Sequence, residues 1–331
     1  MKKAVIINST STYNHLGCYL TMNGLRRLLH NCSINVIFEL EVNNYDFCTV
    51  KKLLDENKSC FLIINGEGTI HDDQPYATAL LRFAEHYEKR TLILNSQLKN
   101  MSSVYIEIMK RFKLVQLRTR ADFDYALEAG LKNIAYCPDM LFNSGLEPRN
   151  FSKSNKPSVV FTDSHDQEQS KTLFEMYSAT PNEVRKWCNI HYLYTGEKKS
   201  SVKSIILYLL AKLAPRLFGY RHLNHISRSS ISSTLDTLYE ATIIVTARYH
   251  TACIGILAGK KIFYGSSNTT KVRDICDDFN VGAPLSEINS NTLTSPEKAQ
   301  VPTQFKNISQ HFIQLVVTVN DCTEESTSKN S

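Results

Sequence analysis

A cation and an imidazole stand two residues apart in Arg248-Tyr249-His250, directly after the apolar run Ile243–Val245. The run is typical of a buried strand, and the small residues after His250 predict a helix. The triplet therefore lies where a strand ends and a helix begins, which is where open α/β sheets bind ligands. Arg248 presents a fork suited to phosphate or carboxylate, His250 can transfer protons near neutral pH, and a helix N-terminus attracts anions. We interpret this stretch as the anionic donor site of a transferase.

Two series of short strands surround this triplet and must position it. Apolar runs bounded by polar loops predict the first series, at residues 4–8, 35–40, 61–64, 91–95, 114–117 and 134–136. The second series is predicted at 158–162, 190–194, 243–245 and 261–264, again with helical patterns in between. Strands that alternate with helices are typical of parallel, doubly wound sheets. We therefore expect an α/β protein with two Rossmann-like domains that face each other across a cleft.

The polar, turn-rich stretch 143–157 separates the two series and predicts a linker. We place an N-terminal domain at 1–145 and a C-terminal domain at 157–320. Residues 322–331 offer nothing to pack and predict a disordered tail. The segment 198–228 holds seven Lys or Arg and no Asp or Glu around an apolar core. This basic amphipathic pattern fits either an anionic membrane surface or packing on the second domain.

The bulk composition narrows the class of protein. Of the 331 residues, 42% are hydrophobic and 21% are charged, as in a globular protein with a core. The net charge of +6 suits anionic ligands, and no nucleic-acid motif accompanies it, so we expect no nucleic-acid partner. Nine cysteines without CxxC pairs or zinc spacing indicate free thiols and no metal site. No apolar run reaches the ~18 residues of a membrane-spanning helix. We expect a cytoplasmic protein, peripheral at the inner face of the plasma membrane if segment 198–228 binds there.

Further motifs occur in a fixed order along the chain. They are Asn14 and Gly17 in an early loop, Gly66-Glu67-Gly68 after a strand, Leu117-Arg118-Thr119, Pro138-Asp139, Arg248-Tyr249-His250 and Lys271. This order resembles the polysaccharide pyruvyl transferase family over about residues 4–282. The resemblance implies a GT-B-like fold. It also implies transfer of the enolpyruvyl unit of phosphoenolpyruvate onto two sugar hydroxyls, which forms a ketal without a metal.

The resemblance also implies roles for the late motifs. Arg248 would hold phosphate or carboxylate, and His250 would act as the general acid that protonates the enolpyruvyl methylene. Lys271 matches a downstream lysine and adds a second positive contact, with Tyr249 in the same donor site. Arg118 matches the arginine of the family's Arg-Asp motif, although Thr119 stands where that motif has Asp.

Two early loops depart from the family pattern. The usual Asn-x-Gly-Asp is Asn14-His15-Leu16-Gly17-Cys18 here, and the usual Gly-Gly-Gly is Gly66-Glu67-Gly68. Both changes put titratable groups at the C-terminal ends of first-domain strands, where the acceptor would bind. We therefore predict His15 and Glu67 as catalytic candidates beside His250. The predicted acceptor-side loops contain Asn14, Gly17, Gly66, Gly68, His71 and Asp72.

Three hypotheses follow from these residues. The first is a transferase of bacterial surface-polysaccharide biosynthesis (capsule, exopolysaccharide or O-antigen) that moves a pyruvyl group from phosphoenolpyruvate to a glycan or lipid-linked oligosaccharide. The alternative is a GT-B glycosyltransferase that uses a nucleotide-activated sugar, either a CMP-keto-sugar acid or a UDP-sugar. The third is a non-catalytic, glycan-binding relative that has kept the fold. None of the three requires a cofactor.

Overall fold

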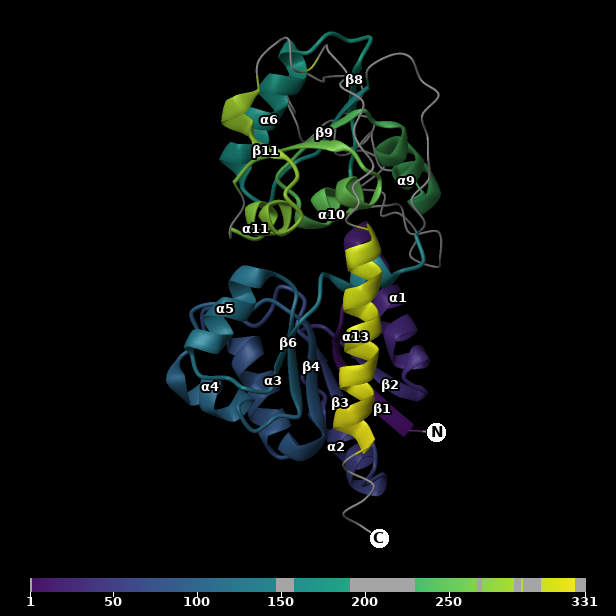
Figure 1. The fold of residues 1–331 in the computed structure, drawn as a ribbon, viewed down its shortest axis with the longest axis vertical. Coiled ribbons are helices and arrows are strands. Elements are labelled where there is room, and N and C mark those ends of the chain that lie inside the picture. The colour runs from purple at the N-terminus through teal and green to yellow at the C-terminus, as the bar shows by residue number, and fades with distance from the viewer. Residues whose placement is uncertain are drawn as a thin grey trace, which may run out of the picture. The chain divides into compact units, whose positions relative to one another are not determined.

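Two parallel β-sheets organise the chain in the computed structural model (Figure 1). The structure describes residues 2–146, 158–190, 230–266, 270–288, 293 and 305–324. Its contacts divide the chain into unit 1, which comprises Met1–Tyr13, Cys18–Leu146 and Gln304–Ser331, and unit 2, which comprises Asn14–Gly17 and Glu147–Thr303. Each unit holds one of the sheets, so the predicted α/β class with two Rossmann-like domains is confirmed.

Unit 1 is built on six parallel strands in the order β2-β1-β3-β4-β5-β6. The strands are β1 (Lys2–Ser9), β2 (Ile34–Glu41), β3 (Phe61–Asn65), β4 (Thr91–Ser96), β5 (Leu114–Leu117) and β6 (Ile134–Tyr136). The helices are α1 (Leu16–Asn31), α2 (Phe47–Glu56), α3 (Pro75–Glu85), η1 (Glu88–Arg90), α4 (Ser103–Met109), α5 (Arg120–Glu128) and η2 (Met140–Asn143). All residues of β3, β4 and β5 are buried. Near-continuous burial is expected of parallel strands that helices cover on both faces.

The long C-terminal helix α13 (Phe305–Glu324) belongs to unit 1, and this corrects two boundary predictions. The C-terminal domain was expected to extend to residue 320, but the contacts of α13 are with the first sheet and its helices. Ile308, Phe312, Leu315 and Val319 are buried along one face of the helix. The helix also continues to Glu324, three residues into the predicted tail, because Thr323 is buried and accepts a 2.7 Å hydrogen bond from Lys2 Nζ. Residues 325–331 lie outside the described part of the chain.

Unit 2 is built on five parallel strands in the order β11-β10-β9-β7-β8. The strands are β7 (Val159–Phe161), β8 (Arg185–Trp187), β9 (Ile243–Thr246), β10 (Lys261–Tyr264) and β11 (Ala283–Pro284). The helices are α6 (Gln167–Ala179), α9 (Ile231–Glu240), α10 (Tyr249–Leu257), α11 (Lys271–Asp278) and η3 (Leu285–Glu287). Of the strand predicted at 190–194, Ile190 lies outside any strand, and residues 191–194 lie outside the described part of the chain. The second strand is instead β8, which Trp187 anchors by packing edge-on against Phe174 and Tyr177.

The basic segment 198–228 lies outside the described residues, so its predicted membrane contact stays a prediction. Among the helices that the structure does describe, none is long and apolar enough to cross a membrane.

Candidate functional site

Each sheet reverses its direction of winding at one point. In unit 1 the chain adds β2 on one side of β1 and β3 on the other, so the reversal lies between β1 and β3. In unit 2 it lies between β7 and β9. The loops that leave two such strands diverge, which opens a crevice at their carboxyl ends where ligands bind in doubly wound folds. We call these places the unit 1 and the unit 2 switch points.

A bidentate ion pair spans the unit 2 switch point. Arg248 follows β9 and Asp163 follows β7, and the guanidinium Nε and Nη2 donate to the two carboxylate oxygens at 2.8 Å each. The side chains are 15% and 7% exposed. The Arg248 backbone N–H donates to Thr246 Oγ1 at 2.9 Å, so the strand end is fixed as well. The third nitrogen, Nη1, donates to none of the residues that the structure describes, which leaves one rigidly aimed donor for an anion.

His250 is the second residue of α10 and packs against His15. The two ring centroids are 5.6 Å apart with the planes at 64°. Gly17 lies closer still, because a Cβ placed on it would be 2.1 Å from His250 Cγ. Sequence analysis assigned His15, Asn14 and Gly17 to the acceptor-side domain, but the contacts place residues 14–17 in unit 2.

The reason for this correction is a backbone contact. Leu16 N donates to Ile190 O at 2.9 Å, and so ties the segment 14–17 to the chain after β8. Asn14 is exposed, His15 is half-buried and Gly17 is buried. His15, Gly17 and His250 thus form one cluster, although they are more than 200 residues apart in the sequence.

The N-terminus of α10 differs from that of the neighbouring helix α6. Asp166 caps α6 and accepts a 2.8 Å hydrogen bond from Gln169 N. The residue at the same position of α10 is Arg248, which gives the helix no side-chain cap. The first N–H groups of a helix need acceptors and attract anions. Of these two helix starts in the described chain, α10 is therefore the one suited to a phosphate.

His165 lies within electrostatic reach of both Arg248 and Lys271. Burial lowers the pKa of His165, and the charges of Arg248 and Lys271 lower it further. Lys271 begins α11 and is half-buried. The positive charges of Arg248 and Lys271 thus act on the same side chain, which favours an anion at this end of the sheet. Within the described residues, no group of three or more His, Cys, Asp or Glu side chains is placed to hold a metal ion.

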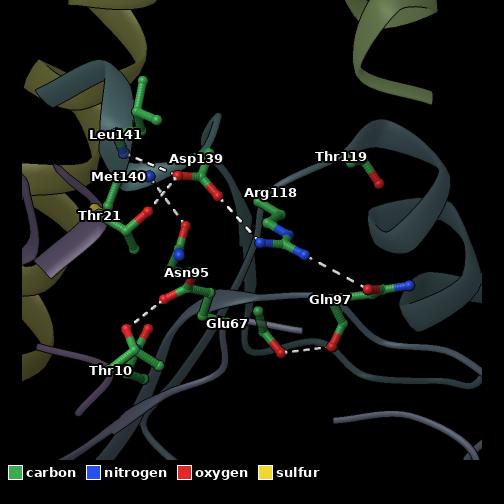
Figure 2. Close-up of polar contacts among 12 residues, drawn as sticks. Thr10, Thr21, Glu67, Asn95, Gln97, Arg118, Thr119, Asp139, Met140 and Leu141 are labelled. Carbon is green, nitrogen blue, oxygen red and sulfur yellow. Dashed lines mark hydrogen bonds and ion pairs between the residues drawn. The ribbon is translucent and has the colours of Figure 1, made fainter. Parts of the chain in front are cut away.

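The unit 1 switch point holds a buried carboxyl group (Figure 2). Glu67 follows β3, is 9% exposed and accepts a 2.7 Å hydrogen bond from Thr10 Oγ1, which follows β1. Burial raises the pKa of Glu67, and the nearby Asp139 carboxylate raises it further, against the opposing effects of Thr10 and Arg118. The carboxyl is therefore poised to keep its proton at higher pH than an exposed glutamate.

Arg118 and Asp139 form a second ion pair in unit 1, visible in Figure 2. Arg118 Nη1 lies 3.1 Å from Asp139 Oδ2, and the side chains are 2% and 0% exposed. Asp139 also accepts hydrogen bonds from Thr21 Oγ1 at 3.1 Å and Leu141 N at 2.9 Å. Sequence analysis grouped Arg118 with the donor-binding residues. The structure brings it together with Asp139 and Glu67 in unit 1, whereas Arg248, Tyr249 and Lys271 belong to unit 2.

Three asparagines end neighbouring strands of unit 1. Asn8 and Asn95 have positive φ values of 64° and 59°, which asparagine tolerates better than most residues. Asn8 Nδ2 donates to Thr69 Oγ1 at 3.0 Å, and Asn65 Nδ2 donates to Asn8 O at 3.1 Å. The buried atoms Asn8 Oδ1, Asn65 Oδ1 and Asn95 Nδ2 have no hydrogen-bond partner in the described chain. Such buried polar groups are usually satisfied by ordered water.

The remaining predicted acceptor-side residues shape the loop after β3. A Cβ on Gly66 would lie 2.6 Å from Ser96 Cβ and 2.7 Å from Ser96 Cα, so only glycine fits there. Gly68 adopts φ +61°, which favours glycine for a different reason. His71 Nδ1 lies 2.7 Å from Asp72 Oδ2, and Asp72 Oδ1 accepts from Asn100 Nδ2 at 2.8 Å. His71 and Asp72 thus tie the loops after β3 and β4 together.

Sequence analysis missed the role of Asp163 and His165 beside Arg248. Asp166, in the same loop, is the cap of α6. The signal that could have singled out Asp163 is the one that singled out Arg248. Both are charged residues placed directly after a predicted buried strand.

Comparison with known proteins identifies the fold. No family model matches the sequence, and no curated protein matches it. The S. aureus MnaA–UDP structure superposes with a TM-score of 0.53 and 11% identity, covering 99% of this chain and 95% of that one. HepE from Anabaena in complex with UDP and glucose gives 0.51 and 12%, covering 99% and 100%. A Listeria monocytogenes protein provisionally assigned as a UDP-N-acetylglucosamine 2-epimerase gives 0.54 and 9%, covering 98% and 97%. The predicted GT-B-like fold is confirmed.

Proposed function

We propose that this protein is a GT-B transferase that uses a nucleotide-activated sugar, with the donor phosphates bound at the unit 2 switch point. The observation that carries the proposal is the meeting of Arg248 and the uncapped start of α10 at the ends of β7 and β9, with Lys271 within electrostatic reach of His165 in the loop after β7. The likeness to proteins crystallised with UDP supports the choice of donor. We infer that the acceptor is a hydroxyl group of a glycan.

The ion pair with Asp163 explains how Arg248 would act. An arginine locked in a bidentate contact loses little conformational entropy when it binds a ligand. Its remaining Nη1 and the first N–H groups of α10 would meet the phosphate oxygens, and Lys271 would add a second charge. When the bond between the sugar and the diphosphate breaks, negative charge develops on the leaving oxygens. Preorganised cations at that point stabilise the transition state more than the bound donor.

His250 is the proton-transfer candidate of this site. It is the second residue of α10, and its ring contacts those of His15 and Tyr249, whose centroids are 5.6 Å and 5.3 Å away. Gly17 packs against the same side chain through the close approach described above. A histidine held in this way can donate a proton to a phosphate or to the methylene carbon of an enolpyruvyl group. Its placement supports transfer chemistry with either donor considered.

Pyruvyl transfer from phosphoenolpyruvate is the second candidate. It is favoured by the pairing of two cations with an adjacent imidazole, since phosphoenolpyruvate carries a phosphate, a carboxylate and a methylene that must be protonated. The same residues would bind both donors, so the choice rests on which ligand the protein takes up.

Calorimetric titration of the full chain with UDP-sugars, CMP-sugars and phosphoenolpyruvate separates these candidates. We expect UDP or CMP donors to bind, and Lys271→Gln to weaken that binding about tenfold, as for a lost charged contact. Lys186→Gln is the matched control, because Lys186 lies on β8 and pairs with Glu240 on the surface. Binding of phosphoenolpyruvate alone would favour pyruvyl transfer. Binding of neither donor would contradict both and leave the glycan-binding hypothesis.

A further inference from the structure

Two large aromatic side chains lie exposed on unit 1 where β1 and β2 end. Tyr13 is 42% exposed and Tyr45 is 55% exposed. Their loops are joined by the backbone, because Val42 N donates to Ser9 O at 2.9 Å. They are joined again by side chains, since Asn43 Nδ2 donates to the Tyr13 hydroxyl at 3.3 Å. We call Tyr13, Asn43 and Tyr45 the tyrosine platform.

The platform packs against one buried and two half-buried aromatic rings. Tyr76 is 8% exposed and meets Tyr45 edge-on, with ring centroids 5.1 Å apart at 79°. Phe47 meets Tyr45 from another side at 6.2 Å and 77°, and itself stacks on Phe83 at 4.6 Å. An exposed ring braced in this way keeps its face available to a ligand without having to be ordered on binding. Clustered exposed aromatics commonly mark binding sites.

The polar groups around the platform define the kind of ligand that fits. Tyrosine and asparagine side chains offer hydrogen bonds beside an apolar ring face. A pyranose has the complementary pattern, with C–H groups on its face and hydroxyls on its rim. The same loop carries Glu41 and Asp46, both exposed, whose carboxylates would repel a phosphate. A neutral sugar ring therefore fits better than a nucleotide.

The platform also lies close to the unit 1 switch point. Burial raises the pKa of the Tyr13 phenol, and the neighbouring Cys18 and Glu67 contribute to that increase. Glu67 is thus within electrostatic reach of Tyr13, and Thr10, to which Tyr13 N donates at 3.1 Å, donates its own hydroxyl to Glu67 at 2.7 Å. Tyr13 and Glu67 both follow strands that border the crevice.

We propose that the tyrosine platform is a carbohydrate subsite that stacks a neutral pyranose ring of the glycan acceptor. As an acceptor subsite it rests on the proposed function. As a sugar-binding surface it stands on the geometry of unit 1 alone.

Site-resolved binding measurements on the full chain test this proposal. Protein labelled with 3-fluorotyrosine is titrated with maltotriose, chitotriose and lactose, and the ¹⁹F signals of Tyr13 and Tyr45 are assigned with Tyr13→Phe and Tyr45→Phe. We expect at least one oligosaccharide to shift both signals saturably, and UDP to leave them unchanged. Tyr45→Ala should weaken the binding of that oligosaccharide about tenfold, as for the loss of an aromatic contact. Leu127→Ala, which alters another exposed apolar residue of unit 1, should leave it unchanged.

Several outcomes would overturn the platform. One is that none of the three sugars shifts the ¹⁹F signal of Tyr13 or Tyr45. Another is that Tyr45→Ala binds the oligosaccharide with unchanged affinity. A third is that only UDP shifts the two signals. Sedimentation velocity tests whether the surface is instead an interface between two copies of the chain. If the wild type is a dimer, Tyr45→Ala is a monomer and sugar binding is unchanged, the proposal fails.

The two proposals fail separately. Loss of donor binding with intact sugar shifts at Tyr45 would remove the transferase and leave a glycan-binding surface. Donor binding that depends on Lys271, with no sugar response at the platform, would remove the subsite and leave the transferase.

Discussion

The two switch points have the same topology and opposite electrostatics. At the unit 1 switch point a carboxyl, Glu67, is buried and hydrogen-bonded to a neutral hydroxyl, and its pKa is raised. At the unit 2 switch point a carboxylate, Asp163, is held by Arg248 at two 2.8 Å contacts, with Lys271 within reach of the same loops. The sheet decides where a crevice forms, and the residues after each strand decide which ligand it suits.

Each unit also contains an arginine–carboxylate pair, and the two pairs differ in burial. Arg118 and Asp139 are 2% and 0% exposed, whereas Arg248 and Asp163 are 15% and 7% exposed. The unit 1 pair also accepts bonds from Thr21 and Leu141, which makes it part of the interior. In the unit 2 pair, Arg248 Nη1 is not bonded to Asp163 and could donate to a ligand. This difference in burial favours a structural role for Arg118 and supports the proposal that Arg248 contacts a ligand.

Breaking the two ion pairs should have the largest effect on the free energy of unfolding, and it should separate the unit 1 pair most clearly from the unit 2 pair. Arg118→Met leaves the Asp139 carboxylate buried without its cation, so we expect the free energy of unfolding to fall by about 3 to 5 kcal/mol. Arg248→Met should lower it by about 1 to 3 kcal/mol and abolish donor binding. Urea unfolding and calorimetric titration measure both.

Arg111→Met serves as the control for these two variants. Arg111 pairs with Glu85 and Glu88 on the surface of unit 1 and is 43% exposed, so its loss should cost less than about 1 kcal/mol. Equal destabilisation by Arg118→Met and Arg248→Met would contradict the contrast between a structural and a ligand-binding pair.

Added methyl groups probe the close packing at each switch point. Gly17→Ala forces a Cβ to 2.1 Å from His250 Cγ, and Gly66→Ala forces one to 2.6 Å from Ser96 Cβ. We expect each change to cost about 1 to 3 kcal/mol of stability. Only the Gly17 cost should disappear when His250 is also replaced by glycine, because the clash is with the Cβ of His250 at 2.4 Å as well as with its ring. A double-mutant cycle measures this coupling, and additive costs would contradict the His250 contact.

Much of the strand framework could be predicted from the sequence, because parallel strands buried on both faces are continuous apolar runs. The predicted strands at 114–117, 134–136 and 261–264 match β5, β6 and β10 to the residue. Strand β8 was missed, because Arg185–Trp187 has one apolar residue and depends on Trp187 packing against α6. Helix α13 was assigned to the wrong unit, since an amphipathic pattern reveals which face is apolar but not which sheet covers it.

The candidate site was only half predictable for a similar reason. Arg248 and His250 stand out because they follow an apolar run directly. Their partners Asp163 and Gly17 lie 85 and more than 200 positions earlier, and only folding brings them together. Glu67 stands out in the sequence as a titratable residue after a strand, but its burial and its bond to Thr10 depend on which strands are neighbours in the sheet.

Removing the charge of Glu67 should make unit 1 less sensitive to pH. The folded pKa of Glu67 is raised above its unfolded value, which is about 4.3. The folded state therefore holds the proton more tightly, and stability is lost as the pH rises from the unfolded pKa through the folded one. Glu67→Gln keeps the shape and cannot ionise, so its melting temperature relative to the wild type should increase from pH 4 to pH 8. A constant difference over that range would show that Glu67 titrates normally.

The smallest expected effect concerns His165 at the unit 2 switch point. Its pKa is lowered, whereas that of Glu67 is raised. Burial and the charges of Arg248 and Lys271 lower the pKa of His165, and a bound phosphate would offset those charges and raise it again. Binding would then take up a proton, so His165 should favour donor binding as the pH falls below about 6.5. The affinity ratio of wild type to His165→Asn for UDP should therefore rise by about threefold between pH 8 and pH 5.5, since His165 is exposed and screened. Taking the ratio cancels the titration of UDP itself, which is common to both proteins. An affinity ratio that does not change with pH would place the phosphate away from His165. A ratio that falls with decreasing pH would mean that the bound ligand adds positive rather than negative charge to this end of the sheet.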